Sequence, residues 1–173
     1  QRSNNSNGKS YLFVVATEDN TTIEVTLPAG VETDTHAAGT TFTQLLNRGE
    51  ILNLFGKSTG HPNLYTGNDL SGTIVKSIST TGSCKPFAMY SGSSKITIDC
   101  DNGSSGSGDN LFQQMFPKQA WGNKVIAIPT LPLIHNFYRI LVGDPATVVT
   151  RNGVALTGLI NNKYYEYYSW RFP

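Results

Sequence analysis

The first part of the chain changes between apolar and polar residues in short, regular runs. Residues 11–16 read YLFVVA, an acidic break of Glu18, Asp19 and Asn20 follows, and residues 22–27 alternate as TIEVTL. Alternation over four to eight residues is typical of a half-buried strand, and a short unbroken apolar run is typical of a buried one. The pattern predicts two strands joined by a turn as a hairpin. A ligand site formed by the three polar residues is the alternative interpretation.

Further strands are expected between turn signals such as Asn47-Arg48-Gly49 and Asn152-Gly153. They cover residues 40–46, 50–55, 72–78, 84–90, 94–100, 124–128, 136–142, 147–150 and 154–156. The segments on either side of Ser91-Gly92-Ser93 are expected to form a hairpin. The fold class that follows is all-β, with an antiparallel β-sandwich-like architecture.

One segment, residues 109–116, is expected to form a short helix. Asp109 is a suitable N-cap, Leu111 and Met115 fall on one helical face, and Pro117 ends the pattern.

A loose internal repeat suggests two related β modules. At a shift of 125 residues, the first strand, the acidic break and the Thr-rich strand meet a similar series around Asp144. The expected organisation is a polar linker at 1–10, a first module at 11–122 and the start of a second, truncated module at 123–173.

The repeat also bears on the acidic break. Its counterpart keeps one acidic residue, Asp144, but has no equivalent of Glu18 or Asn20, and Pro145 follows directly. A ligand site would need its other oxygens, whereas a turn tolerates this change. We therefore expect the break to be a turn that Asp19 orders through its side chain.

Charged residues are scarce, at 14% against about 25% in an average soluble protein. Ser, Thr, Asn and 17 glycines take their place, which is typical of extracellular β proteins. The net charge of +1 and the scattered Lys and Arg argue against nucleic-acid binding. No apolar run approaches the length of a membrane-spanning helix, and we expect a secreted chain. Asn4, Asn20 and Asn102 begin sequons and are candidate glycan acceptors.

The two cysteines, Cys84 and Cys100, are too few for a zinc site. If the expected hairpin is centred on Gly92, they lie opposite each other at a distance that a disulfide spans. Closing a loop of this size stabilises a fold by about 3 kcal/mol. We expect a Cys84–Cys100 disulfide, and the alternative is two reduced thiols in a cytosolic protein.

Motifs for catalysis and metal binding are absent from the sequence. There is no G-x-S-x-G, P-loop, H-E-x-x-H or C-x-x-C motif. His36, His61 and His135 stand in expected loops and match no triad spacing. An acidic stretch at 99–110 departs from an EF-hand at its glycine and glutamate positions. We expect no catalytic residue, no metal and no cofactor.

Aromatic residues are concentrated near the C-terminus, where residues 164–172 read YYEYYSWRF. Tyr165, Tyr167 and Trp170, together with Trp121, are candidate ligand contacts because aromatic rings stack well on sugars. The alternative is that these tyrosines lie half in a core and half at its rim.

Six stretches, taken together and in order, resemble the N-terminal domain family of IgG Fc-binding proteins, found in secreted mucus and matrix proteins and in bacterial surface proteins. They are FVVATEDNTTIEV at 13–25, LNRGEILNL at 46–54, DLSGTIVKS at 69–77, KPFAMYSG at 85–92, DNLFQQMFPKQAWG at 109–122 and FYRILVGDPATVVTRNG at 137–153. The resemblance implies a secreted, all-β, non-catalytic domain of a larger protein that works in adhesion or binding. No residue matches an antibody-contacting motif, so immunoglobulin binding is not implied.

These observations lead to three hypotheses. The first is an extracellular interaction module whose loops at 56–69 and 101–108, and whose exposed edges, contact another protein or a matrix or mucus component. The second is a carbohydrate-binding module that uses the exposed Trp and Tyr residues to bind glycans. A hydrolase is a distant third.

Overall fold

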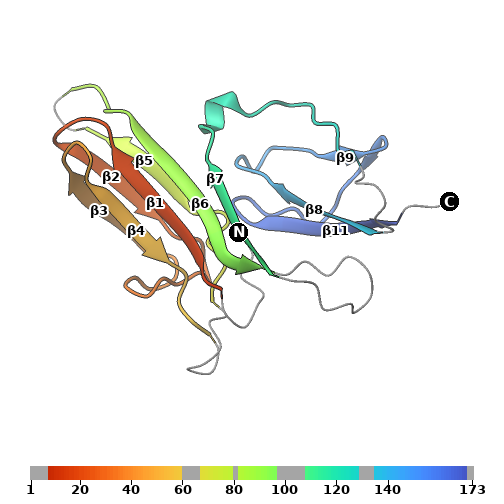
Figure 1. Ribbon diagram of the computed structural model, residues 1–173. Coiled ribbons are helices and arrows are strands. Elements are labelled where there is room, and N and C mark those ends of the chain that lie inside the picture. The colour runs from red at the N-terminus through yellow and green to blue at the C-terminus, as the bar shows by residue number, and fades with distance from the viewer. Residues whose placement is uncertain (1–7, 60–66, 80–81, 97–107, 129–134, 171–173) are drawn as a thin grey trace. The chain divides into compact units, whose positions relative to one another are not determined.

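The computed structural model describes residues 8–59, 67–79, 82–96, 108–128 and 135–170, and no side chains at 135 and 168–170 (Figure 1). The chain divides into two compact units. Unit 1 comprises Gln1–Thr97 and Ser107–Met115, and unit 2 comprises Ile98–Gly106 and Phe116–Pro173. The almost all-β fold class is confirmed. The predicted division into related modules at 122/123 stays a prediction.

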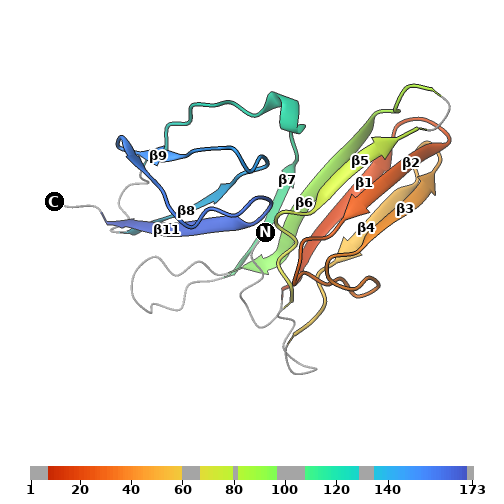
Figure 2. The same cartoon turned by 180° about the vertical axis from the view of Figure 1, so that it is seen from behind.

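Unit 1 contains two antiparallel sheets (Figures 1 and 2). The first has the order β4-β1-β6-β7, from β4 (Ile51–Phe55), β1 (Ser10–Ala16), β6 (Phe87–Ile96) and β7 (Asp109–Gln114). The second has the order β3-β2-β5, from β3 (Thr41–Leu46), β2 (Thr21–Thr26) and β5 (Ile74–Ile78).

The core of unit 1 lies between the two sheets and follows from the alternation in β1 and β2. Every second residue of β1 is fully buried, and so is every second residue of β2. The buried apolar residues form one cluster, made of Leu12, Val14, Ala16, Ile23, Val25, Leu27, Leu46, Leu54 and Leu70. Each large side chain buried in this way contributes about 1.5–3 kcal/mol. The sandwich-like arrangement is therefore held together by its inner faces.

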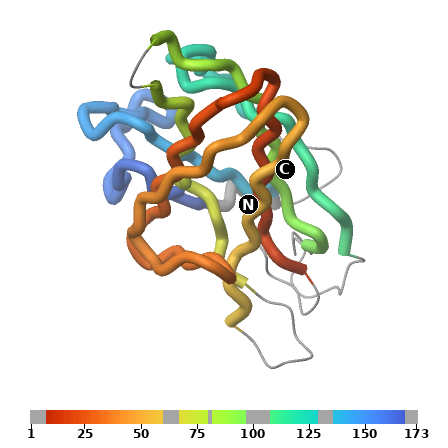
Figure 3. The backbone as a smooth tube through the Cα atoms, turned by 90° about the vertical axis from the view of Figure 1, so that its left-hand side faces the viewer, coloured from red at the N-terminus to blue at the C-terminus, as the bar shows by residue number. Residues whose placement is uncertain are grey.

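The predicted hairpin between the first two strands is wrong in its pairing, although the turn is correct. β1 pairs with β4 and β6, whereas β2 pairs with β3 and β5, so the turn at 17–20 crosses from one sheet to the other. The turn at 47–50 does the same between β3 and β4. Figures 1 and 3 show these two turns side by side at one end of unit 1. Crossing between sheets lets consecutive strands bury their apolar faces against each other.

The predicted helix at 109–116 is also wrong. Residues 109–114 form β7, which pairs with β6 so that Phe112 lies opposite Gly92 and Leu111 opposite Ser93. A helix of two turns is marginal by itself, whereas backbone pairing with a strand already in place satisfies the same groups. Within the described residues, the helical structure is a single 3-10 turn, Lys118–Ala120 (η1).

The predicted hairpin centred on Gly92 does not form, because β6 runs straight through Ser91-Gly92-Ser93. Ser91 and Ser93 face the core and are buried, so these polar residues are part of a strand and not a turn. The register that placed the two cysteines opposite each other is therefore lost. Cys84 is exposed ahead of β6, and Cys100 lies outside the described residues, so the disulfide stays a prediction.

Unit 2 contains two antiparallel ribbons. β8 (His135–Leu141) pairs with β11 (Tyr164–Trp170), and β9 (Thr150–Arg151) pairs with β10 (Val154–Ala155). The turn between β9 and β10 confirms the predicted Asn152-Gly153 hairpin, with positive φ at both residues. The predicted strand at 124–128 is not found, and its apolar residues are exposed. In the described part of the chain, no helix has the length and hydropathy to span a membrane.

Candidate functional site

Both faces of the four-stranded sheet are apolar, the outer face as well as the face that packs in the core. In β1, the buried residues Leu12, Val14 and Ala16 alternate with Tyr11, Phe13 and Val15, which point to the opposite face. A sheet with one solvent-facing side normally carries polar residues there. The unbroken apolar run at 11–16 thus supplies apolar side chains to both faces of β1.

The register of the neighbouring strands brings further aromatic residues onto this outer face. Phe13 lies opposite Tyr90, Tyr11 lies opposite Phe55, and Phe112 lies opposite Gly92. The ring centroids are 4.9 Å apart for Phe13 and Tyr90, 5.3 Å for Tyr90 and Phe112, and 5.8 Å for Phe13 and Phe112. We call the five residues Tyr11, Phe13, Phe55, Tyr90 and Phe112 the aromatic face.

Gly92 makes this convergence possible. A Cβ atom at this position would lie 2.5 Å from the ring of Tyr11 and 2.1 Å from the carbonyl oxygen of Leu111. Tyr11 therefore lies across β6, and its hydroxyl donates to the carbonyl of Leu111 at 3.0 Å. A second contact joins that hydroxyl to Oδ1 of Asn110 at 3.3 Å. The aromatic face is thus held in place by backbone as well as by ring contacts.

Much of this surface is open to solvent. Phe112 is 57% exposed, Phe55 is 40% exposed, and the neighbouring Ile51 is 57% exposed. With β6 taken from Ala88 to Gly92, ahead of its register shift, the outward positions of the four paired strands carry no charged side chain. They are Ile51, Asn53, Phe55, Tyr11, Phe13, Val15, Ala88, Tyr90, Gly92, Asn110, Phe112 and Gln114. An aromatic centre with an amide rim and no charge is the composition of a protein-binding surface.

The acidic break at 18–20 has an architectural role. Oδ1 of Asp19 accepts a hydrogen bond from the backbone N–H of Arg48 at 3.0 Å, and the N–H of Asn20 donates to Oδ1 of Asn47 at 3.2 Å. The Lys85 ammonium donates to the backbone carbonyl of Asp19. These contacts connect the two turns that cross between the sheets, so Asp19 orders a pair of turns and not its own turn alone.

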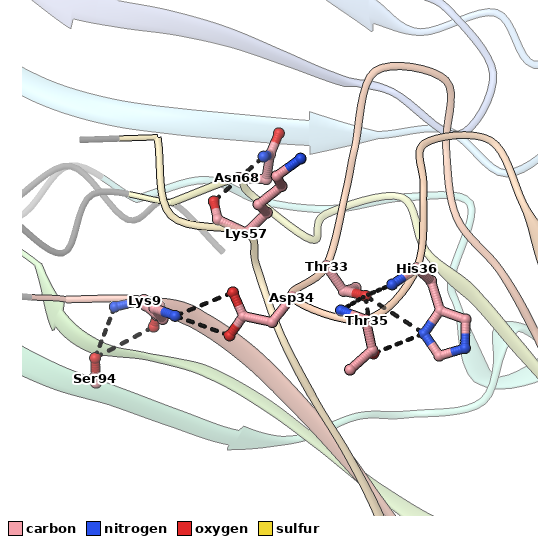
Figure 4. A network of polar contacts seen from close by, with 8 residues as sticks. All are labelled: Lys9, Thr33, Asp34, Thr35, His36, Lys57, Asn68 and Ser94. Carbon is pink, nitrogen blue, oxygen red and sulfur yellow. Dashed lines mark hydrogen bonds and ion pairs between the residues drawn. The ribbon is translucent and has the colours of Figure 1, made fainter. Parts of the chain in front are cut away.

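A polar network at the other end of unit 1 is also structural (Figure 4). Lys9 forms an ion pair with Asp34 at 2.8 Å, and Lys57 forms one with Glu32 at 2.5 Å. His36 lies against the ring of Phe42 at a centroid distance of 3.6 Å, with Nδ1 2.8 Å from the hydroxyl of Thr35. These contacts connect the loop after β2 to the ends of β1 and β4.

The predicted ligand residues are distributed within unit 2. Tyr165 and Tyr167 are half-buried on one face of β11, with ring centroids 6.4 Å apart. Tyr167 stacks on Tyr138 at 5.2 Å, and the guanidinium of Arg151 lies 4.9 Å above its ring. Trp121 is 45% exposed, and among the described residues no ring contact joins it to either tyrosine. The side chain of Trp170 lies outside the described residues.

Several other predicted residues also lie outside the description. They are Asn4, Asn102 and His61, the side chain of His135, and nearly all of the loop at 101–108. Asn20 is exposed at its turn, with a φ of 55°. The described residues contain no group of three or more His, Cys, Asp or Glu side chains arranged to hold a metal ion.

Sequence reasoning missed the aromatic face, although the apolar run at 11–16 was its signal.

The comparisons with known proteins agree with the resemblance seen in the sequence. A family model described as IgGFc binding protein matches residues 1–171. Searches of curated proteins and of solved structures gave no match. Since the family model covers essentially the whole sequence, the chain belongs to the IgGFc binding protein family.

Proposed function

We propose that this chain is an extracellular, non-catalytic domain that binds another protein through its aromatic face. The observation that carries the proposal is the cluster of stacked, solvent-accessible rings on a sheet whose outward positions carry no charge. Membership of a family described by its binding to a protein supports it. Adhesion within mucus or matrix, as part of a larger secreted protein, is the physiological setting that we propose.

The shape of the site favours a protein partner over a small molecule. Four neighbouring strands form an open surface, and its five aromatic residues are spread across all four of them. A few residues near the centre of a protein–protein interface supply most of its binding energy, and aromatic residues are enriched in such interfaces inside a polar rim. The matching partner presents an apolar patch with few charges, because an unpaired charge buried against these rings would be costly.

The test measures binding of the purified domain to immobilised IgG Fc, the probe that the family description names, by biolayer interferometry. Phe55→Ser and Ile51→Ser remove exposed apolar side chains from the outer surface of β4. Leu45→Ser is the matched control, because Leu45 is 54% exposed but belongs to β3 of the other sheet.

We expect each β4 substitution to weaken binding by about tenfold, which is the effect of losing one important contact, and the control to bind as the wild type does. Equal binding by the wild type and the three variants would overturn the assignment of the aromatic face as the binding surface. Absence of saturable binding to Fc would overturn Fc as the partner.

A second candidate is a carbohydrate-binding surface in unit 2. It is favoured by the exposed Arg151, whose guanidinium lies over Tyr167 next to Tyr165, because acidic sugars combine a carboxylate with apolar C–H groups. A glycan array tests it. Loss of a specific signal in Arg151→Gln and Tyr165→Ala, but not in Phe55→Ser, would favour this candidate over the first.

A further inference from the structure

β7 is an edge strand of its sheet. It has a pairing partner, β6, on one side only within the described residues. The N–H of Met115 donates to the carbonyl of Met89 at 2.8 Å, which shows that the odd-numbered residues direct their backbone groups toward β6. The backbone groups of Asn110, Phe112 and Gln114 therefore point away from the sheet. Of these, the carbonyl of Gln114 accepts a bond from the side chain of Gln113 at 3.0 Å.

The middle of this edge lacks two features by which proteins prevent edge strands from pairing, a charged residue in mid-strand and a proline. The register shift between Ser93 and Ile96 and the charge of Asp109 are both confined to the start of β7. β5, an edge of the other sheet, has Lys76 at its centre. β7 reads DNLFQQ, with its single charge at the first residue, Asp109. The five residues that follow offer an uncharged strand to a second chain.

We propose that β7 pairs with β7 of a second copy of this chain, antiparallel and with the two-fold axis at Phe112. In this register Phe112 faces its own equivalent, and Asn110 faces Gln114 of the second copy. The three residues with outward backbone groups then meet one another in hydrogen-bonded pairs, each of which exchanges two hydrogen bonds. The proposal goes beyond the proposed function, since it does not depend on a foreign partner.

The side-chain chemistry suits this register. Asn and Gln amides are complementary donors and acceptors, two Phe rings stack favourably across a strand pair, and Asp109 faces Met115, so no like charges are opposed. Phe112 already stacks on Tyr90 and Phe13. Pairing at β7 therefore joins the aromatic faces of two copies into one continuous sheet surface.

The interface made by one strand pair is smaller than the roughly 800 Å² per partner of a stable complex. We therefore expect weak association, with a Kd of about 10–100 µM. Such a dimer would gain in importance wherever copies are held at high local concentration.

The experiment is sedimentation equilibrium of the whole chain between about 5 and 500 µM, a range chosen to bracket the expected Kd. The N110K/Q114K variant opposes two lysines across both amide pairs, whereas N110K/Q114E opposes a lysine and a glutamate. Both variants share Asn110→Lys, and both positions are exposed with backbone groups directed away from β6. Thermal melts are expected to be alike for the two, which makes them a matched pair.

We expect wild type and N110K/Q114E to form dimers, and N110K/Q114K to associate at least tenfold more weakly, with the difference reduced at high salt. A monomeric wild type at the highest concentration would overturn the proposal. Equal dimerisation of the two variants would also overturn it, because the contact would then lie elsewhere. Binding to Fc by the β4 surface is measured separately and does not depend on this outcome.

Discussion

Gly92→Ala is the substitution that most directly tests the packing of the aromatic face. Gly92 lies inside β6 without a positive φ, in a backbone conformation that alanine adopts readily. By conformational preference alone, alanine in a strand is favoured over glycine by about 0.5–1 kcal/mol. A stabilised protein would therefore be expected if only the backbone mattered.

The surroundings of Gly92 reverse that expectation. The added Cβ would lie 2.1 Å from the carbonyl oxygen of Leu111 and 2.5 Å from the ring of Tyr11, far inside van der Waals contact. The ring can move, but the carbonyl belongs to the backbone of β7, so relief requires β7 to shift away from β6. Overpacking of this kind costs about 1–3 kcal/mol, and we expect the upper half of that range.

The assay is urea unfolding followed by far-UV circular dichroism, because both tryptophans, Trp121 and Trp170, belong to unit 2, whereas Gly92 belongs to unit 1. Gly82→Ala is the control, because no atom of the described residues lies within 4 Å of a Cβ added at Gly82, and Gly82 has no positive φ. We expect Gly92→Ala to lower the free energy of unfolding by about 2–3 kcal/mol and the control to leave it within about 0.5 kcal/mol. A loss below about 0.5 kcal/mol for Gly92→Ala would refute the close approach of β7 and Tyr11.

Three further predictions concern the turn at Asp19, the disulfide and the glycan. Asp19→Ala removes the acceptor for the N–H of Arg48 and is expected to cost about 0.5–1 kcal/mol in urea unfolding. Glu18→Ala is expected to be neutral, because the exposed Glu18 carboxylate makes no hydrogen bond or ion pair with the described residues. Alkylation of the secreted protein without reductant is expected to leave Cys84 unlabelled in its disulfide with Cys100, and mass spectrometry showing two labelled thiols would contradict this. Protein from a eukaryotic secretory host is expected to carry a glycan on the exposed Asn20, so that peptide-N-glycosidase treatment of its tryptic peptide shifts the mass.

The strands of unit 1 could be predicted from the sequence because alternation reports burial directly. Ile23, Val25 and Leu27 are all buried, as their spacing of two indicates. The partner of each strand could not be predicted in the same way. A hairpin and a crossing between sheets both require two amphipathic strands and a polar turn, and only the tertiary structure distinguishes them.

Local sequence patterns could not predict the aromatic face for a similar reason. Phe13 and Tyr90 are 77 positions apart in the sequence, and their contact depends on the register between β1 and β6. Local patterns conceal that register, because Ser91-Gly92-Ser93 consists of the small residues that are typical of turns. In the fold, the two serines are buried and the glycine leaves room for Tyr11.

Phe112 shows why the assignment of one short segment decides what the molecule can bind. In a helix over 109–116, Phe112 would lie beside Met115 and Phe116 on the same apolar face as Leu111, and it would have no place in a sheet. In the strand, Leu111 turns toward the core and Phe112 joins the stack with Tyr90. The same strand directs the backbone groups of Phe112 away from β6, to a side of the sheet where no other described strand pairs with them. The ring and the backbone of one residue thus belong to two different surfaces, one suited to a foreign protein and the other to a second copy. A substitution that changes only the ring, such as Phe112→Thr, should therefore weaken Fc binding while retaining the register of the dimer, since threonine keeps the strand and its N–H.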